Sequence, residues 1–169
     1  QALQQELAAG GMEITRIAHD SEHALEIELP FLQRALAGSF ELLPLMVRCR
    51  NQAEAQLLGK SLGKVLSGEQ ALLVASTDLS HFYPLEIATA LDQEMLRRMA
   101  AFSPEAVLEA EETGTGFACG AYAVAAAMWA ARELGAQRVQ VLHHSTSADQ
   151  TGDASSVVGY GAAVFLQPS

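Results

Sequence analysis

The spacing of apolar residues changes several times along the 169-residue chain and divides it into short helices and strands. Leucines three and four residues apart follow Ser21 and recur in residues 52–66, which is the spacing of a helix with one buried face. The stretch from Ala71 to Ala75 is continuously apolar, short and bounded by polar residues, which is typical of a buried strand. The alternation of the two patterns predicts an α/β fold.

The expected helices lie at residues 2–7, from Asp20 or Ser21 to about residue 36, at 52–66, at 85–101, from Ser103 onward, and from Cys119 to near Gly135. The expected strands lie at residues 12–18, 40–47, 71–75, 138–145 and 157–166. Pro30 is expected to kink the second helix, because proline lacks the N–H that a helix interior needs. Because strands alternate with helices, we expect a mixed, largely parallel sheet flanked by helices.

Length and charge favour a single domain and argue against a nucleic-acid-binding or membrane-spanning protein. Half of the residues are hydrophobic, 18% are charged, and the formal net charge is −10. A chain of this length suits one domain with a sizeable core, so residues 1–169 are interpreted as a single α/β domain. The negative charge argues against a nucleic-acid partner. We expect no membrane span, because the longest small apolar run is short, and two dissimilar cysteines predict a reducing, cytoplasmic setting.

The first candidate site follows the strand expected at residues 71–75. Asp78 and His81 are three residues apart where that strand would end, and open α/β sheets place their chemistry at such strand ends. The same stretch is equally typical of a turn in which Asp78 and Ser80 bond to local backbone N–H groups. The pattern alone leaves both interpretations open.

Two further residues have suggestive neighbours. Cys119 lies between glycine-rich backbone and a helix start, where the helix dipole favours a thiolate, although a buried structural thiol fits the same place. His23 is expected in the first turn of a helix, with Asp20 and Glu22 able to hold its ring, or else exposed without a partner.

The other histidines and the second cysteine are weaker candidates. His143 and His144 are adjacent in an expected strand, so they point to opposite faces and cannot both serve one site. Cys49 lies beside two arginines but has no histidine or acid near it in sequence, and we interpret it as structural.

Several segments together resemble one family. Residues 22–32, which read Glu-His-Ala-Leu-Glu-Ile-Glu-Leu-Pro-Phe-Leu, are similar to the Glu-His-Ser-Ile-Glu-x-x-Leu-Pro-Phe segment of the Memo family. Residues 76–82 resemble its Ser-Ser-Asp-Leu-Ser-His-Tyr turn. Cys119-Gly120 stands where that family has a Cys-Gly helix start, and residues 151–160 resemble its C-terminal signature. The matching segments occur in the family's order and span nearly the whole chain.

The family's bacterial and archaeal members are called AmmeMemoRadiSam system protein B, and its fold is similar to that of class III extradiol dioxygenases of the LigB type. The resemblance implies a mononuclear iron or copper site built from two histidines and a cysteine. His23 and Cys119 match two of these ligands, and Asp78 and His81 match acid/base or supporting groups of the same pocket.

Two departures from the family pattern affect this expectation. The family's other histidine ligand belongs to a Pro-His-Ala-Gly segment that this chain does not contain, so the resemblance implies that the N-terminal part of the domain is missing. The family's Cys-Gly-Arg-His-Pro is Cys-Gly-Ala-Tyr-Ala at residues 119–123, which removes an arginine and a histidine near the pocket.

Three functions remain in view. The first is a metal-binding, dioxygenase-like protein that performs redox or oxygen chemistry on an unknown small molecule or peptide, with partner proteins of the AmmeMemoRadiSam system. Thiolate and imidazole ligands suit iron or copper better than magnesium. The second is a hydrolase or transferase whose nucleophile is Cys119 paired with His81, or Ser80 assisted by a histidine. The third is a non-catalytic adaptor that binds a peptide or protein, because fold similarity does not establish catalysis.

Overall fold

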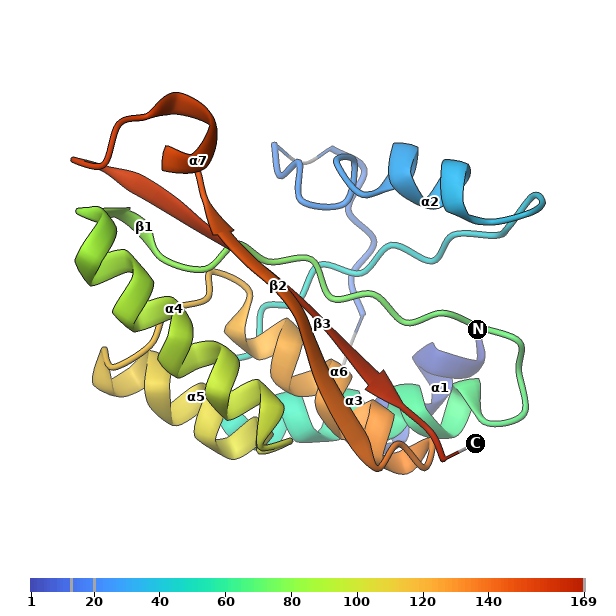
Figure 1. Cartoon of the computed structure of the whole chain (residues 1–169). Coiled ribbons are helices and arrows are strands. Elements are labelled where there is room, and N and C mark those ends of the chain that lie inside the picture. Colours follow the sequence, from blue (N-terminus) through green and yellow to red (C-terminus); the bar gives the residue numbers. More distant parts are fainter. Residues whose placement is uncertain (13, 20, 169) are drawn as a thin grey trace.

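The computed structural model describes residues 1–168 except residues 13 and 20 (Figure 1). The helices are α1 (Ala2–Ala9), α2 (Leu29–Ala35), α3 (Gln52–Leu66), α4 (Leu85–Ala100), α5 (Pro104–Thr113), α6 (Ala121–Glu133) and the short α7 (Ala148–Thr151). The strands are β1 (His81–Tyr83), β2 (Arg138–Thr146) and β3 (Val157–Leu166). Within the described residues we find no helix with the length and apolar character that crossing a bilayer requires.

Most expected helices are confirmed, and side-chain hydrogen bonds explain where two of them begin. The Asn51 side chain accepts the Glu54 N–H at 3.0 Å at the start of α3, and Ser103 accepts the Ala106 N–H at 3.3 Å at the start of α5. Pro104 occupies the first turn of α5, where its missing N–H leaves no bond unmade. These caps fix where the two helices begin.

The second helix is the exception, because it begins later than predicted. Residues 24–28 form turns, and α2 starts at Leu29. Pro30 therefore lies in the first turn of α2 and not inside a longer helix, so the kink predicted at Pro30 is wrong. The expected cap at Asp20 lies outside the described residues.

The sheet differs from the predicted one in direction. The described strands form one three-stranded sheet in the order β1-β3-β2, and both pairings are antiparallel. The prediction of a largely parallel sheet is therefore wrong, whereas the strands expected at 138–145 and 157–166 are confirmed. They form a long ribbon whose register runs from Arg138 opposite Leu166 to Thr146 opposite Gly159.

The strands predicted at 12–18, 40–47 and 71–75 are not found among the described residues. Leu73 packs against a buried cluster, but Leu72 is 66% exposed and Val74 is 41% exposed. The apolar run therefore predicted burial correctly for one side of the segment. A strand also needs a hydrogen-bonded neighbour, which the apolar pattern cannot reveal.

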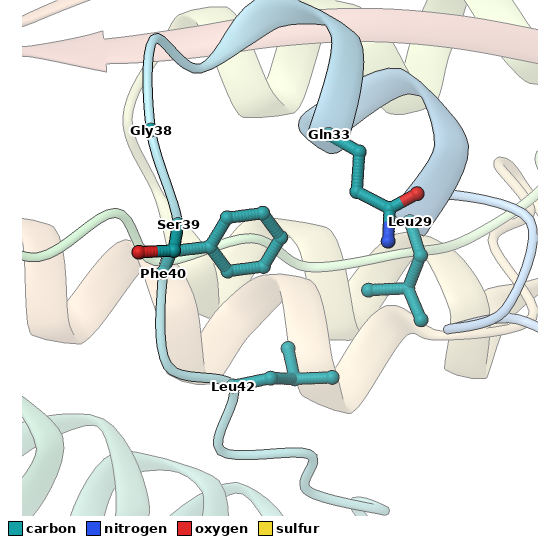
Figure 2. Close-up of a pocket in the computed structure, with 6 residues that line it drawn as sticks. All are labelled: Leu29, Gln33, Gly38, Ser39, Phe40 and Leu42. Atoms are coloured by element: carbon teal, nitrogen blue, oxygen red, sulfur yellow. The ribbon is translucent and has the colours of Figure 1, made fainter.

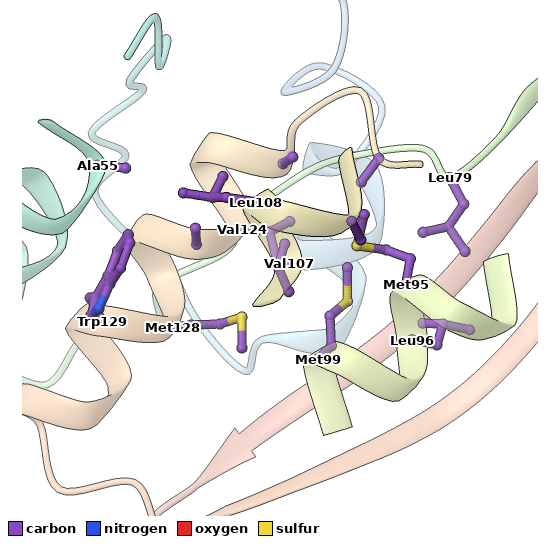
Figure 3. Close-up of a cluster of buried hydrophobic side chains, with 14 residues drawn as sticks. Ala55, Leu79, Met95, Leu96, Met99, Val107, Leu108, Val124, Met128 and Trp129 are labelled. Carbon is purple, nitrogen blue, oxygen red and sulfur yellow. The ribbon is translucent and has the colours of Figure 1, made fainter. Parts of the chain in front are cut away.

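The largest core lies between α4, α5 and α6, and Figure 3 shows their side chains meeting there. Its largest members are Leu79, Met95, Leu96, Met99, Val107, Leu108, Val124, Met128 and Trp129. A second cluster joins α1, α3 and α6. The alanine-rich α6 contributes to both clusters, so its small residues allow close helix packing on two sides.

Glycines set the closest approaches. A Cβ at Gly59 of α3 would lie 2.4 Å from the Ala126 carbonyl oxygen of α6, so the two helices touch through backbone. On the sheet, a Cβ at Gly159 would lie 2.0 Å from Asp92 Oδ2, and one at Gly161 would lie 3.0 Å from Leu79. Strand β3 can thus lie directly against α4 and against the segment that leads into β1.

Candidate functional site

The segment from Ser76 to His81 contacts both of the other predicted motifs. On one side, the Ser76 hydroxyl donates to the Ala24 carbonyl oxygen at 2.7 Å and lies 3.3 Å from Glu28 Oε1. Both partners belong to the turn that carries His23. The resemblance placed these two segments in one pocket, and these hydrogen bonds join them directly.

On its other side the segment binds the start of α6. The Asp78 N–H donates to Cys119 Sγ at 3.3 Å, and the Cys119 N–H donates to the Asp78 carbonyl oxygen at 3.2 Å. The Thr77 hydroxyl lies 3.5 Å from Sγ and accepts the Gly120 N–H at 2.8 Å. Cys119 is exposed. The thiol therefore has fixed polar neighbours and an open side.

Gly120 allows this close contact. A Cβ there would lie 3.0 Å from both Thr77 Cβ and Thr77 Oγ1, which is tighter than ordinary packing. The N-cap residue of α6 has no side chain of its own, and the Thr77 oxygen accepts the N–H of that residue. Cys119 and Gly120 therefore join the start of α6 to residues 77 and 78.

His23 has a carboxylate partner, although not the one proposed from the sequence. Its Nδ1 lies 2.5 Å from Glu26 Oε2, and this hydrogen bond, followed by the Glu26 charge, raises the pKa of His23 above its ordinary value. Glu22 Oε1 instead accepts the N–H groups of His23 and Ala24, at 2.8 and 2.9 Å. A proton on Nδ1 leaves Nε2 as the ring's acceptor.

Asp78 and His81 lie near each other, as the sequence suggested. His81 Nε2 is 3.4 Å from Asp78 Oδ2 without the angle of a hydrogen bond, and this nitrogen is buried and has no hydrogen-bond partner among the described residues. The rings of Phe82 and Phe117 flank the imidazole at centroid distances of 5.7 and 5.6 Å. The turn interpretation is incomplete, because His81 also belongs to β1.

Iron or copper needs more ligands than these motifs place together. Among the described residues, no three side chains of His, Cys, Asp and Glu form a group that could hold a metal ion. The His23 ring is directed at Glu26 and its side chain is 79% exposed. Cys119 and His23 are chemically suitable donors, but the described residues do not make a complete site, so the metal stays a prediction.

The weaker candidates, His143, His144 and Cys49, lie in different surroundings. His143 is exposed, whereas the adjacent His144 contacts the buried Asp92, which agrees with opposite faces of β2. Cys49 packs against both buried clusters, and burial, followed by the Glu54 charge, raises the pKa of its thiol. Both observations fit the structural interpretation of Cys49.

Asp92 is a residue that the sequence analysis missed. It occupies the buried face of α4 together with Ala88, Met95, Leu96 and Met99. A carboxylate on an otherwise apolar face was the available signal, since buried acids are rare without a partner.

A hollow of about 390 Å³ lies beside α2, apart from these motifs. Figure 2 shows the residues that line it, which are Leu29, Gln33, Gly38, Ser39, Phe40 and Leu42. None of them is a predicted site residue.

The fold and these contacts define an α/β protein in which a His-containing turn, an Asp-x-x-His segment and a Cys-Gly helix start meet. The profile described as "Memo-like protein" matches residues 1–164, and the chain belongs to this family. It is similar to a "MEMO1 family protein" of Ignicoccus hospitalis, with 35% identity over 153 residues that cover 89% of this chain and 54% of the relative. A "MEMO1 family protein" of Aquifex aeolicus is 37% identical over 149 residues, which cover 88% and 56%.

These comparisons confirm the family resemblance. The chain spans about half the length of these curated relatives. The likeness to LigB-type dioxygenases stays a prediction.

Proposed function

We propose that the chain contributes Cys119 Sγ and His23 Nε2 to a mononuclear iron or copper site used for redox or oxygen chemistry on a small molecule or peptide. The observation that supports this most is the double contact of residues 76–78, with the His23 turn through Ser76 and with Cys119 through Asp78. The remaining coordination positions are filled from outside the described residues, by water or by a further histidine of the whole protein or its partners.

The two proposed ligands differ in how they are oriented. The Asp78 N–H is directed at Cys119 Sγ, so the fold fixes the position of the sulfur, a soft metal ligand. The Glu26 carboxylate accepts the hydrogen bond from the proton on His23 Nδ1, which leaves the lone pair of Nε2 available to bind a metal ion. This is the usual arrangement of a metal-binding histidine and its supporting carboxylate. Iron and copper both accept such mixed sulfur and nitrogen ligands.

Asp78 and His81 are proposed to handle protons beside the ligands. His81 Nε2 is buried without a hydrogen-bond partner among the described residues, and the Asp78 carboxylate 3.4 Å away can orient and charge-stabilise it. The Phe82 and Phe117 rings flank the imidazole and contribute to its fixed position. The proposed role of the imidazole is to accept or release one proton at Nε2.

Metal content of purified variants tests the ligand assignment. The protein is loaded with Cu(II), or with Fe(II) under anaerobic conditions, in the presence and absence of imidazole, which can fill an open position. We expect wild type to retain the metal and His23→Ala and Cys119→Ala to lose it. His143→Ala and Cys49→Ala are the matched controls and keep it. Equal metal content in wild type, His23→Ala and Cys119→Ala contradicts the proposal.

The hydrolase or transferase alternative gains no support from the contacts of Cys119. Its sulfur contacts the Thr77 hydroxyl and the Asp78 N–H, and no hydrogen bond joins it to His81 among the described residues. A cysteine nucleophile needs such a base within hydrogen-bond reach.

The adaptor alternative is favoured by one feature, the exposed surface of α2. None of the described residues of α2 is fully buried, and Phe31 is 70% exposed. The same helix supplies Leu29 and Gln33 to the hollow shown in Figure 2. An adaptor that uses this surface binds an apolar peptide in the presence of a chelator and loses it in Phe31→Ser. Fluorescence titration with a labelled apolar peptide measures this, and equal affinity of the two proteins excludes α2 as the binding surface.

A further inference from the structure

Asp92 is a completely buried carboxylate that connects α4 with two other parts of the fold. Its Oδ1 accepts the Ser80 N–H at 2.9 Å, and its Oδ2 lies 2.9 Å from His144 Nε2 on β2. A carboxylate can only accept hydrogen bonds, so we assign to His144 the tautomer that carries its proton on Nε2. Because a buried carboxylate without partners is very unfavourable, both contacts are needed to keep Asp92 in place.

Ser80 is held from two directions by this arrangement. Asp92 accepts the Ser80 N–H, and the Ser80 carbonyl oxygen accepts the Gly159 N–H at 2.8 Å. The Leu79 N–H donates to the Gly159 carbonyl oxygen at 2.9 Å, so the strand and the segment exchange two bonds. Gly159 is required here, since a Cβ would lie 2.0 Å from Asp92 Oδ2.

The next residue is His81, and the backbone just after it is strained. Phe82 has a φ of 63°, which a bulky side chain rarely adopts, and the β1-β3 register shifts between His81 and Tyr83. Such a conformation persists when the surrounding structure fixes it. On the N-terminal side of His81, the backbone is held in place by the hydrogen bonds of Ser80.

We propose that Asp92 and His144 are positioning residues that hold the His81 imidazole in place through Ser80. The role of His81 in chemistry rests on the proposed function, whereas its position is a separate property of the protein. His144 keeps the carboxylate oriented, Asp92 anchors the Ser80 N–H, and the anchored backbone sets where the His81 ring lies relative to Asp78.

The test compares two histidines that are adjacent on β2. His144→Leu removes the N–H donor, His144→Gln retains a donor, and His143→Leu changes the neighbour on the opposite face. Two readouts are used in the metal-free protein with labelled histidine: the ring signals of His81, assigned from the spectrum of His81→Gln, and the hydrogen exchange rate of the Ser80 amide. Neither depends on metal binding, so a failure of the proposed function does not affect them.

In His144→Leu we expect the His81 ring signals to shift and the Ser80 amide to exchange about tenfold faster or more, as for a locally opened backbone bond. His144→Gln restores both toward wild type, and His143→Leu leaves both unchanged. A folded His144→Leu protein with wild-type His81 signals and Ser80 exchange overturns the proposal.

Asp92→Asn provides a second readout, which tests the hydrogen bond between Asp92 and His144 directly. The amide oxygen can still accept the Ser80 N–H, but the amide nitrogen now donates to His144 Nε2. We expect the His144 nitrogen signals to change from the Nε2–H form to the Nδ1–H form. A folded Asp92→Asn protein that keeps the Nε2–H form contradicts the assignment, and if this variant does not fold, the His144 variants decide the question.

Discussion

The two sides of the candidate site are held in different ways. Cys119 is joined to Asp78 by two reciprocal hydrogen bonds, and Gly120 is joined to Thr77, across 41 to 43 residues of sequence. His23 is held by Glu22 and Glu26, which lie within three residues of it, and its side chain is 79% exposed. The tertiary fold therefore positions the thiol, whereas a local turn positions the imidazole.

This difference has a consequence for ligand binding. A donor fixed by the fold is oriented before the ligand arrives, while a donor on an exposed turn loses freedom when it binds. We therefore expect substitutions near Cys119 to disturb the structure more than equivalent substitutions near His23.

The largest effect is expected at Gly159, which exchanges hydrogen bonds with Leu79 and Ser80, next to the Asp78 that holds Cys119. Gly159→Val places a side chain where Asp92 Oδ2 lies, and overpacking of this kind costs about 3 kcal/mol or more in the free energy of unfolding. Urea unfolding measures it. Gly38→Val is the control, because nothing lies within 4 Å of a Cβ at Gly38. If the two variants are equally stable, β3 and α4 do not touch at this point.

A smaller effect on the free energy of unfolding compares the Cys119 side with the His23 side directly. Thr77→Val removes the oxygen that accepts the Gly120 N–H, leaving a partly buried donor unpaired at a cost of about 1–3 kcal/mol. Ser76→Ala removes the hydroxyl donor to Ala24 on the His23 side and costs about 0.5–1.5 kcal/mol. Chemical unfolding of both variants ranks them. A larger loss for Ser76→Ala would reverse the comparison.

The smallest effect concerns ion pairs on the surface of α4 and α5. Hydrogen bonds from Arg97 and Arg98 lower the pKa of Glu94 to about 2, and Arg98 also binds Glu109 of α5. Because the folded pKa is below the ordinary value of 4.5, this stabilisation is present above pH 4.5 and is lost as the pH falls through about 2.

Glu94→Gln removes the titrating group. We expect a slightly less stable protein at neutral pH and a flatter loss of stability between about pH 4.5 and 2, measured by thermal unfolding across this range. An acid profile identical to wild type would show that the ion pairs are fully screened by solvent.

The sequence predicted the helices well because their signals are local. Asn51, Ser103 and Pro104 mark helix starts through bonds made within one turn, and these starts are confirmed. The sheet was predicted less well, since the apolar run at 71–75 shows that a segment packs but not which strand pairs with it. The antiparallel β1-β3-β2 order depends on contacts between distant segments, which residue spacing does not encode.

The candidate site shows the same division. The motifs around His23, Asp78 and Cys119 were identified from their residues, and the structure brings their segments into contact. Asp92 was missed because its partners, Ser80 and His144, are 12 and 52 residues away in sequence. Glu26 was not singled out as the partner of His23, since the expected helix placed several carboxylates near the ring.

A metal–sulfur bond to Cys119 is the most direct test of the account. X-ray absorption of the copper- or iron-loaded protein measures the atoms bound to the metal. We predict a sulfur neighbour at bonding distance in wild type and in Cys49→Ser, and its loss in Cys119→Ser. A metal bound by nitrogen and oxygen neighbours in all three proteins, with no sulfur in any of them, would contradict the proposed site.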